Sequence, residues 1–196
     1  MKKLLITAVM LSLASGAACA GSQAKGGGVK YKPYAIEGGY FSCLVPSGWS
    51  LERDKDRDED YKIYEIQLLG PKAGKAPTSI QVSFFAAGNS DFKDYQNFIE
   101  RNSRNALGEQ RNARESYAPV KETSVAGRKA FELASEVNEY LHPESKSDES
   151  VLIKEKIYVL PAKDGFYALR FSAPKPAFKA NLSVFEKVAK SFKGMP

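Results

Sequence analysis

The fold is decided by Gly165-Phe166-Tyr167-Ala168-Leu169-Arg170-Phe171-Ser172-Ala173-Pro174. Large apolar side chains recur at every second position, in Tyr167, Leu169 and Phe171, which is typical of a β-strand with one buried face. A second alternating run at residues 153–159 precedes it, and a turn at residues 161–165 joins the two. The pair predicts an antiparallel hairpin.

An amphipathic helix is expected directly after this strand. Pro174 and Pro176 end the strand and favour a helix start, and Gly194 is expected to stop the helix. Because a helix with an apolar stripe must bury it, this one is expected to cover a sheet face. The stripe consists of Phe178, Leu182, Phe185, Val188, Ala189 and Phe192.

Earlier segments show the same alternation. Runs starting at Phe41, Tyr64 and Ile80 predict strands, and the last two form an antiparallel pair. Two more strands are expected at residues 120–125 and 131–137, on either side of a turn.

A second helix is expected from Phe92 to Asn102. Ser90 or Asp91 would cap it, and Gly108 would close it. The whole pattern predicts an α+β fold, with an antiparallel sheet of about six or seven strands sandwiched by amphipathic helices.

Residues 1–20 have the pattern of an export signal peptide. Lys2 and Lys3 precede an apolar stretch from Leu4 to Leu13, and small residues follow up to Ala20. The apolar stretch is too short for a permanent membrane span, which needs about 20 apolar residues. We therefore expect a periplasmic or secreted protein.

Two ways of processing this leader stay open. Cleavage after Ala20 gives a soluble mature chain. The loose lipobox Ser15-Gly16-Ala17-Ala18-Cys19 would instead make Cys19 a lipidated first residue and anchor the protein to a membrane, although Gly16 replaces the usual aliphatic residue. Residues 21–33 are expected to form a flexible linker or tether, and residues 34–196 a single domain.

Composition indicates a globular domain. Hydrophobic residues make up 43% of the chain, and removal of Lys2 and Lys3 lowers the formal net charge from +6 to +4. Lysines are interleaved with acids along the sequence, which argues against nucleic acid as a partner. Attraction to anionic lipid headgroups stays open.

Cys43 is expected to be a small buried hydrophobe. Cys19 is removed or acylated in either form of the mature chain, so no internal disulfide can form. Phe41, Cys43 and Val45 share one face of a strand, which favours burial over a reactive thiol.

One acidic segment resembles a calcium-binding loop. Asp54, Asp56 and Asp58 alternate, and Glu65 stands at the last ligand position. Such a loop needs glycine where Glu59 stands, and its flanks are expected to be strands here. We favour a solvated hairpin tip and keep a calcium or manganese site, through Asp54, Asp56, Asp58 and Glu65, as the alternative.

The sequence shows no set of catalytic residues. His142, the only histidine, lies in a polar loop, and Glu132 and Glu136 fall on the polar face of a strand. The sequence contains neither a Gly-x-Ser-x-Gly elbow nor a glycine-rich phosphate loop. We expect no catalytic residue, no cofactor and no resident metal, and a protein that is not an enzyme.

Two segments carry a resemblance to a known family. Phe41-Ser42-Cys43-Leu44-Val45-Pro46-Ser47-Gly48-Trp49 and the stretch 165–174, with the terminal residues 188–192, are similar to the PsbP family and its bacterial relatives, the DcrB-like periplasmic lipoproteins. The likeness extends over residues 40–193 as an order of elements. It implies an antiparallel sheet between helices, and binding or assembly functions.

Three functional hypotheses follow. The favoured one is a non-catalytic binding or assembly module of the cell envelope that holds a protein partner or hydrophobic segment. The second is the divalent metal site described above. The third is a hydrolase with an unfamiliar site, which would need a pocket with convergent polar groups.

Overall fold

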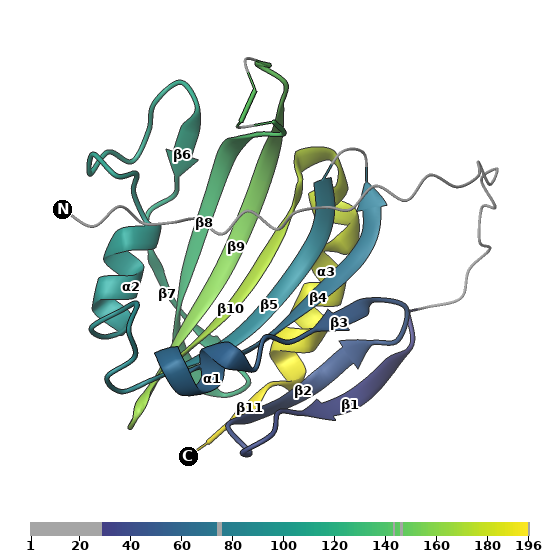
Figure 1. Cartoon of the computed structure of the whole chain (residues 1–196), viewed down its shortest axis with the longest axis vertical. Helices are drawn as coiled ribbons and strands as arrows, with labels where there is room; N and C mark the ends of the chain where they lie inside the picture. Colours follow the sequence, from purple (N-terminus) through teal and green to yellow (C-terminus); the bar gives the residue numbers. More distant parts are fainter. Residues whose placement is uncertain (1–28, 74–75, 143, 146, 196) are drawn as a thin grey trace.

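The structure, a computed structural model, describes residues 29–73, 76–142, 144–145 and 147–195. The expected signal peptide, Cys19 and most of the expected linker lie outside these residues. Within them, the main element is an eight-stranded antiparallel sheet in the order β3-β4-β5-β10-β9-β8-β6, with β7 also paired to β8 (Figure 1). The strands are β3 (Ser50–Glu52), β4 (Ile63–Ala73), β5 (Ala76–Ala86), β6 (Glu115–Tyr117), β7 (Lys121–Val125), β8 (Arg128–Tyr140), β9 (Ser150–Ala162) and β10 (Gly165–Pro174).

The α+β class and the antiparallel pairing are confirmed. The sheet has more strands than the six or seven expected, because β3 and β6 have three residues each and are too short to show alternation. The predicted β4–β5 pair also forms, with Leu68 opposite Ile80.

The predicted hairpin of β9 and β10 lies in the middle of this sheet. Leu169 of β10 faces Tyr158 of β9 on one side and Val82 of β5 on the other. Gly165 starts β10 at a φ of +143°, and a Cβ there would lie 2.1 Å from the carbonyl oxygen of Phe85. Only glycine therefore allows β10 to approach β5 so closely.

A second, three-stranded sheet has the order β1-β2-β11. It contains β1 (Tyr31–Ala35), β2 (Phe41–Pro46) and β11 (Lys193–Gly194). Two expectations are wrong here. Residues 31–33, assigned to the linker, pair with β2, and Gly194, expected to stop a helix, is a strand residue paired with Phe41. Both pairings join segments far apart in the sequence, so no local pattern indicates them.

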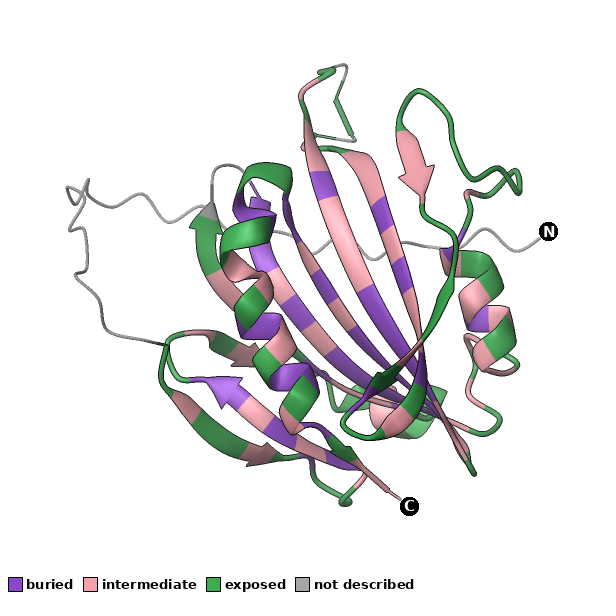
Figure 2. Cartoon of the chain, turned by 180° about the vertical axis from the view of Figure 1, so that it is seen from behind, coloured by how far each residue is buried: buried purple, intermediate pink, exposed green. Residues whose placement is uncertain are grey.

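Alternate residues of the main sheet face two separate cores. Tyr158 and Leu160 belong to one apolar cluster, whereas Ile157 and Val159 belong to the other. The first cluster also contains Phe178 and other residues of α3 (Lys175–Ser191), together with Phe41, Cys43 and Val45 of β2. Helix α3 and the small sheet thus cover one face, as Figure 2 shows from behind. The predicted helix after Pro174 is confirmed.

The second cluster lies under α2 (Tyr95–Asn102). Phe98 of this helix packs against Phe85 of β5 and Phe166 of β10, with ring centroids 5.6 and 5.4 Å apart. The helix is shorter than expected, because its N-cap is Asp94, whose side chain accepts a hydrogen bond from the Asn97 N–H, and it ends before Ser103. Helices thus cover both faces of the sheet, as predicted.

A third helix, α1 (Asp56–Tyr61), replaces the solvated hairpin tip expected between β3 and β4. None of its residues is buried, so no apolar stripe marked it in the sequence. Acidic side chains in its first turn favour a helix start. Among the described residues, no helix is long and apolar enough to cross a membrane.

Candidate functional site

The acidic side chains of the segment around α1 contact separate partners and do not converge on one metal-binding centre. Asp58 forms an ion pair with Arg53, and these side chains are only 13% and 12% exposed. Asp54 accepts a hydrogen bond from the Asp56 N–H at 3.1 Å. No group of three or more potential metal ligands was found among the described residues. The expected alternative, an ion held by Asp54, Asp56, Asp58 and Glu65, is therefore not supported by the geometry.

Glu65 lies on the sheet face under α2 and is fully engaged by protein donors. Its Oε1 accepts from Arg57 at 2.8 Å, and its Oε2 accepts from Gln81 at 2.8 Å and Ser83 at 3.2 Å. These residues line a cavity of about 140 Å³ that also borders Arg170. The charged side chains around this cavity are paired, Arg57 with Glu65 and Asp91, and Arg170 with Glu155, so we assign them a structural role.

Cys43 is buried and reduced. It is 4% exposed on β2, and burial raises the pKa of the Cys43 thiol to about 12. The expectation that it acts as a small hydrophobe is confirmed. His142 is exposed in the loop after β8, and its Nε2 lies 3.5 Å from Oε2 of Glu149.

Glu132 and Glu136 are paired with lysines across the sheet. Glu132 lies 3.2 Å from Lys156, and Glu136 lies 3.1 Å from Lys154 and 2.7 Å from Lys175 at the start of α3. Both glutamates lie at polar positions of β8, as the sequence indicates, but their side chains are half-buried instead of solvent-facing. Their charges are balanced, so they form no acidic site.

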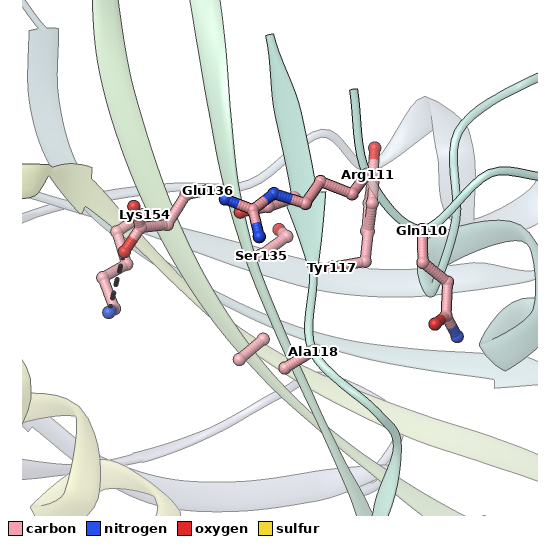
Figure 3. Close-up of a pocket in the computed structure, with 9 residues that line it drawn as sticks. Gln110, Arg111, Tyr117, Ala118, Ser135, Glu136 and Lys154 are labelled. Carbon is pink, nitrogen blue, oxygen red and sulfur yellow. Dashed lines mark hydrogen bonds and ion pairs between the residues drawn. The ribbon is translucent and has the colours of Figure 1, made fainter. Parts of the chain in front are cut away.

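A cleft of about 390 Å³ opens where β6 meets β8. In Figure 3 the side chain of Arg111 extends from the preceding loop toward Ser135 and Glu136 of β8. Among the described residues, no hydrogen bond or ion pair engages the Arg111 guanidinium. The cleft is lined by Gln110, Arg111, Ser116, Tyr117, Ala118, Ala134, Ser135, Glu136 and Lys154.

Tyr117 forms one wall of this cleft. Burial raises the pKa of Tyr117, and so does its hydrogen bond to Glu115, to which the hydroxyl donates at 2.6 Å. The phenol therefore stays neutral and donating at any physiological pH.

The loop that supplies Gln110 and Arg111 carries the most exposed large apolar side chain in the described part of the chain. Leu107 is 82% exposed. Asn105 holds the loop closed, because its Oδ1 accepts from the N–H groups of Leu107 at 3.0 Å and Glu109 at 2.9 Å. Its own N–H donates to the Glu109 carbonyl at 2.9 Å. We call the 103–114 loop, β6 and the cleft the β6 surface.

No periodic pattern in the sequence indicates the β6 surface. Gly108, expected to close a helix, instead has a φ of +82° in the turn that Asn105 organises. Asparagine followed closely by glycine in a polar segment is a turn signal, and it could have located this loop. The cleft itself is not evident from the sequence, because the loop and the β8 residues that line it are far apart along the chain.

Comparison of the whole chain with solved structures identifies the fold. Cyanobacterial PsbP (CyanoP) of Synechocystis sp. PCC 6803 superimposes with a TM-score of 0.50 over 89% of this chain and 98% of that one, at 14% sequence identity. The fold is that of PsbP. The resemblance in the first strand and the closing hairpin is thereby confirmed at the level of fold.

A second solved structure is also similar to this chain. A Bacteroides thetaiotaomicron protein matches with a TM-score of 0.51 at 15% identity, over 84% of this chain, which spans 48% of that protein. No protein-family model and no curated protein matches the sequence. A shared PsbP fold at such low identity does not transfer a function.

Proposed function

We propose that this protein is an exported, non-catalytic binding module of the cell envelope that holds a protein partner at the β6 surface. The observation that carries the proposal is Leu107, which is 82% exposed on a loop fixed by Asn105. Single exposed leucines are common on protein surfaces. A rigid loop differs, because its side chain can enter a partner's pocket with little loss of conformational entropy.

The charges around Leu107 favour a partner with acidic groups. Arg104 and Arg111 lie on either side of Leu107 in the sequence, are exposed, and have no ion-pair partner among the described residues. Arginine beside an apolar contact is typical of the central part of protein interfaces. A carboxylate of the partner placed in the cleft would pair with Arg111.

The module is proposed to act outside the cytoplasm. Residues 1–20 would direct export, and Cys19 would anchor the protein if it is acylated. Residues 20–30 would then connect the anchor to the PsbP-like domain. The intact mass of the mature protein, measured separately from membrane and soluble fractions, tests the anchor. An acyl increment on a chain that starts at Cys19 would support it, and an unmodified chain that starts at Gly21 would contradict it.

Site-specific cross-linking tests the binding surface. A photo-reactive residue replaces Leu107 in cells that export the protein, and Lys163, exposed in the β9–β10 turn, serves as the control position. We expect one defined adduct from position 107 and none of that mass from position 163. Arg111→Glu should abolish the adduct, whereas Lys163→Glu should leave it.

Identical background adducts at both positions would contradict the proposed surface.

The proposal that the protein is not an enzyme has a separate test. If the purified protein turned over a substrate and one polar replacement abolished that turnover without unfolding it, the protein would be an enzyme.

A further inference from the structure

The outer side of α3 carries a continuous row of lysines. At about 100° per residue, they occupy a sector of roughly 120° on a helix about 25 Å long. Phe178, Phe185 and Val188 lie on the opposite side, buried in the core. The row consists of Lys175, Lys179, Lys187 and Lys190, with exposed Ser183 among them and Lys193 of β11 just beyond.

The positive charge of the domain is concentrated here. Residues 175–194 contain five lysines and one glutamate, a net charge of +4, whereas residues 29–174 contain 21 basic and 22 acidic residues. The expectation that lysines are interleaved with acids is wrong for this helix, because helical periodicity places its lysines on one side.

Most of these lysines form no ion pair within the described part of the chain. Lys175 is paired with Glu136 at 2.7 Å. The one acid of the helix, Glu186, is engaged by Lys156 at 3.0 Å and by the Tyr158 hydroxyl. No ion pair within the described residues involves the exposed Lys179, Lys187, Lys190 or Lys193. Figure 2 shows this side of α3 uncovered by other elements.

We propose that this lysine face, Lys179, Lys187, Lys190 and Lys193, docks on the anionic phospholipid surface of a membrane. Each lysine is a point charge on a flexible stem, and the exposed residues between them are small or polar, such as Ala180 and Ser183. A protein interface would need a shaped apolar or aromatic anchor at its centre. A layer of lipid phosphates requires only charge and a flat approach, which this helix provides.

The lysine face is separate from Leu107, so this inference does not rest on the proposed partner. A lipidated Cys19 would carry at least two acyl chains, which anchor a protein stably by themselves. The lysine face would then hold the folded domain itself against the membrane surface.

Vesicle partitioning tests the inference in the exported protein carrying Cys19→Ala, which cannot be acylated and keeps small residues at the cleavage site. The probe is a vesicle of phosphatidylcholine mixed with phosphatidylglycerol, compared with pure phosphatidylcholine. The test variant is Lys179→Gln/Lys187→Gln/Lys190→Gln. The control variant, Lys62→Gln/Lys93→Gln/Lys163→Gln, removes the same charge from exposed positions outside α3.

We expect binding to the mixed vesicles that weakens steeply with salt, and little binding to phosphatidylcholine. Each lysine near the surface contributes about fivefold, so the test variant should lose roughly a hundredfold in partitioning, and the control less than fivefold. Thermal unfolding of both variants should match the parent, because all six lysines are exposed.

Three results would overturn the inference: no binding to mixed vesicles, equal binding to both vesicle types, or equal losses in the two variants. If the test variant kept its vesicle binding but lost an acidic protein partner in the envelope, the face would be a protein interface instead.

Discussion

The hydroxyl of Ser191 connects the last residue of α3 to β2, where it accepts a hydrogen bond from the Leu44 N–H at 2.8 Å. The same hydroxyl donates to the carbonyl of Val188 at 2.8 Å. Leu44 and Ser191 lie 147 positions apart in the sequence. Because β11 begins only at Lys193, Ser191 satisfies a strand N–H that β11 is too short to reach.

Replacing Ser191 with alanine should destabilise the fold by about 1 to 3 kcal/mol, since the Leu44 N–H would lose its partner in a partly buried place. Chemical denaturation measures the loss. Ser183→Ala is the matched control, because Ser183 is exposed on the same helix and should change stability by less than about 0.5 kcal/mol. Equal effects of the two variants would show that the Ser191 hydrogen bond contributes nothing.

Tyr167→Phe should also cost about 1 to 3 kcal/mol. The Tyr167 hydroxyl donates to the Tyr40 carbonyl at 2.9 Å and accepts from the Met195 N–H at 2.8 Å, so it joins the C-terminus to the turn before β2. Denaturation and hydrogen exchange at Met195 measure the effect. Tyr140→Phe, at a ring that is 39% exposed, should be near neutral, and a loss as large as that of Tyr167→Phe would contradict this explanation.

Gly165→Ala should prevent normal folding or destabilise it by more than about 4 kcal/mol, because the new Cβ would collide with the Phe85 carbonyl in a backbone conformation that favours glycine. Circular dichroism and the yield of soluble protein report the outcome. Gly48→Ala is the control, since its Cβ would meet nothing within 4 Å. A native-like Gly165→Ala protein would contradict the close approach of β10 to β5.

The Cys43 thiol makes stability depend on pH in alkaline solution. Its pKa is raised from the ordinary value of 9.0 to about 12 by burial. The unfolded thiol releases its proton first, so this contribution is complete below pH 9.0 and declines as pH rises toward 12, by about 1.4 kcal/mol per unit. The slope between those values should be shallower in Cys43→Ala. Parallel slopes would mean that the Cys43 thiol is already solvated in the native state.

Calcium and manganese should leave the unfolding temperature unchanged at millimolar concentration. Asp58 is held by Arg53, and Glu65 by Arg57, Gln81 and Ser83, so a cation would have to displace arginines from both acids. Calorimetric titration gives a second measurement. Saturable heat that disappears in Asp54→Asn/Asp56→Asn would restore the metal-binding alternative.

Much of the fold could be predicted from periodicity. Tyr167, Leu169 and Phe171 marked β10, the stripe from Phe178 to Phe192 marked α3, and alternation at Ile66 and Val82 marked the β4–β5 pair. These elements are long and amphipathic, so each has a clear repeat. Short elements, α1 and β6 among them, have no repeat to detect and were not predicted.

The candidate sites depend on contacts between distant segments. The cleft forms only because the fold places Arg111 beside β8. The carboxylates of Asp58 and Glu65 do not converge, because Arg53 pairs with the first and Arg57 with the second. Charge alternation around Asp56 allowed either a loop with converging acids or a solvated hairpin tip. The segment instead forms α1, whose packing on β4 no local pattern indicates.

The sequence by itself determined the antiparallel sheet, its two covering helices and the burial of Cys43, because these follow from the spacing of apolar side chains along the chain. Tertiary structure decided which surfaces are available for binding. It paired Asp58, Glu65, Glu132 and Glu136 with nearby cations and left Leu107, Arg111 and the α3 lysines exposed. It also paired β2 with β11 near the end of the chain. The physical reason is that apolar burial acts through local periodicity, whereas charge pairing depends on which distant side chains the fold brings within a few ångströms.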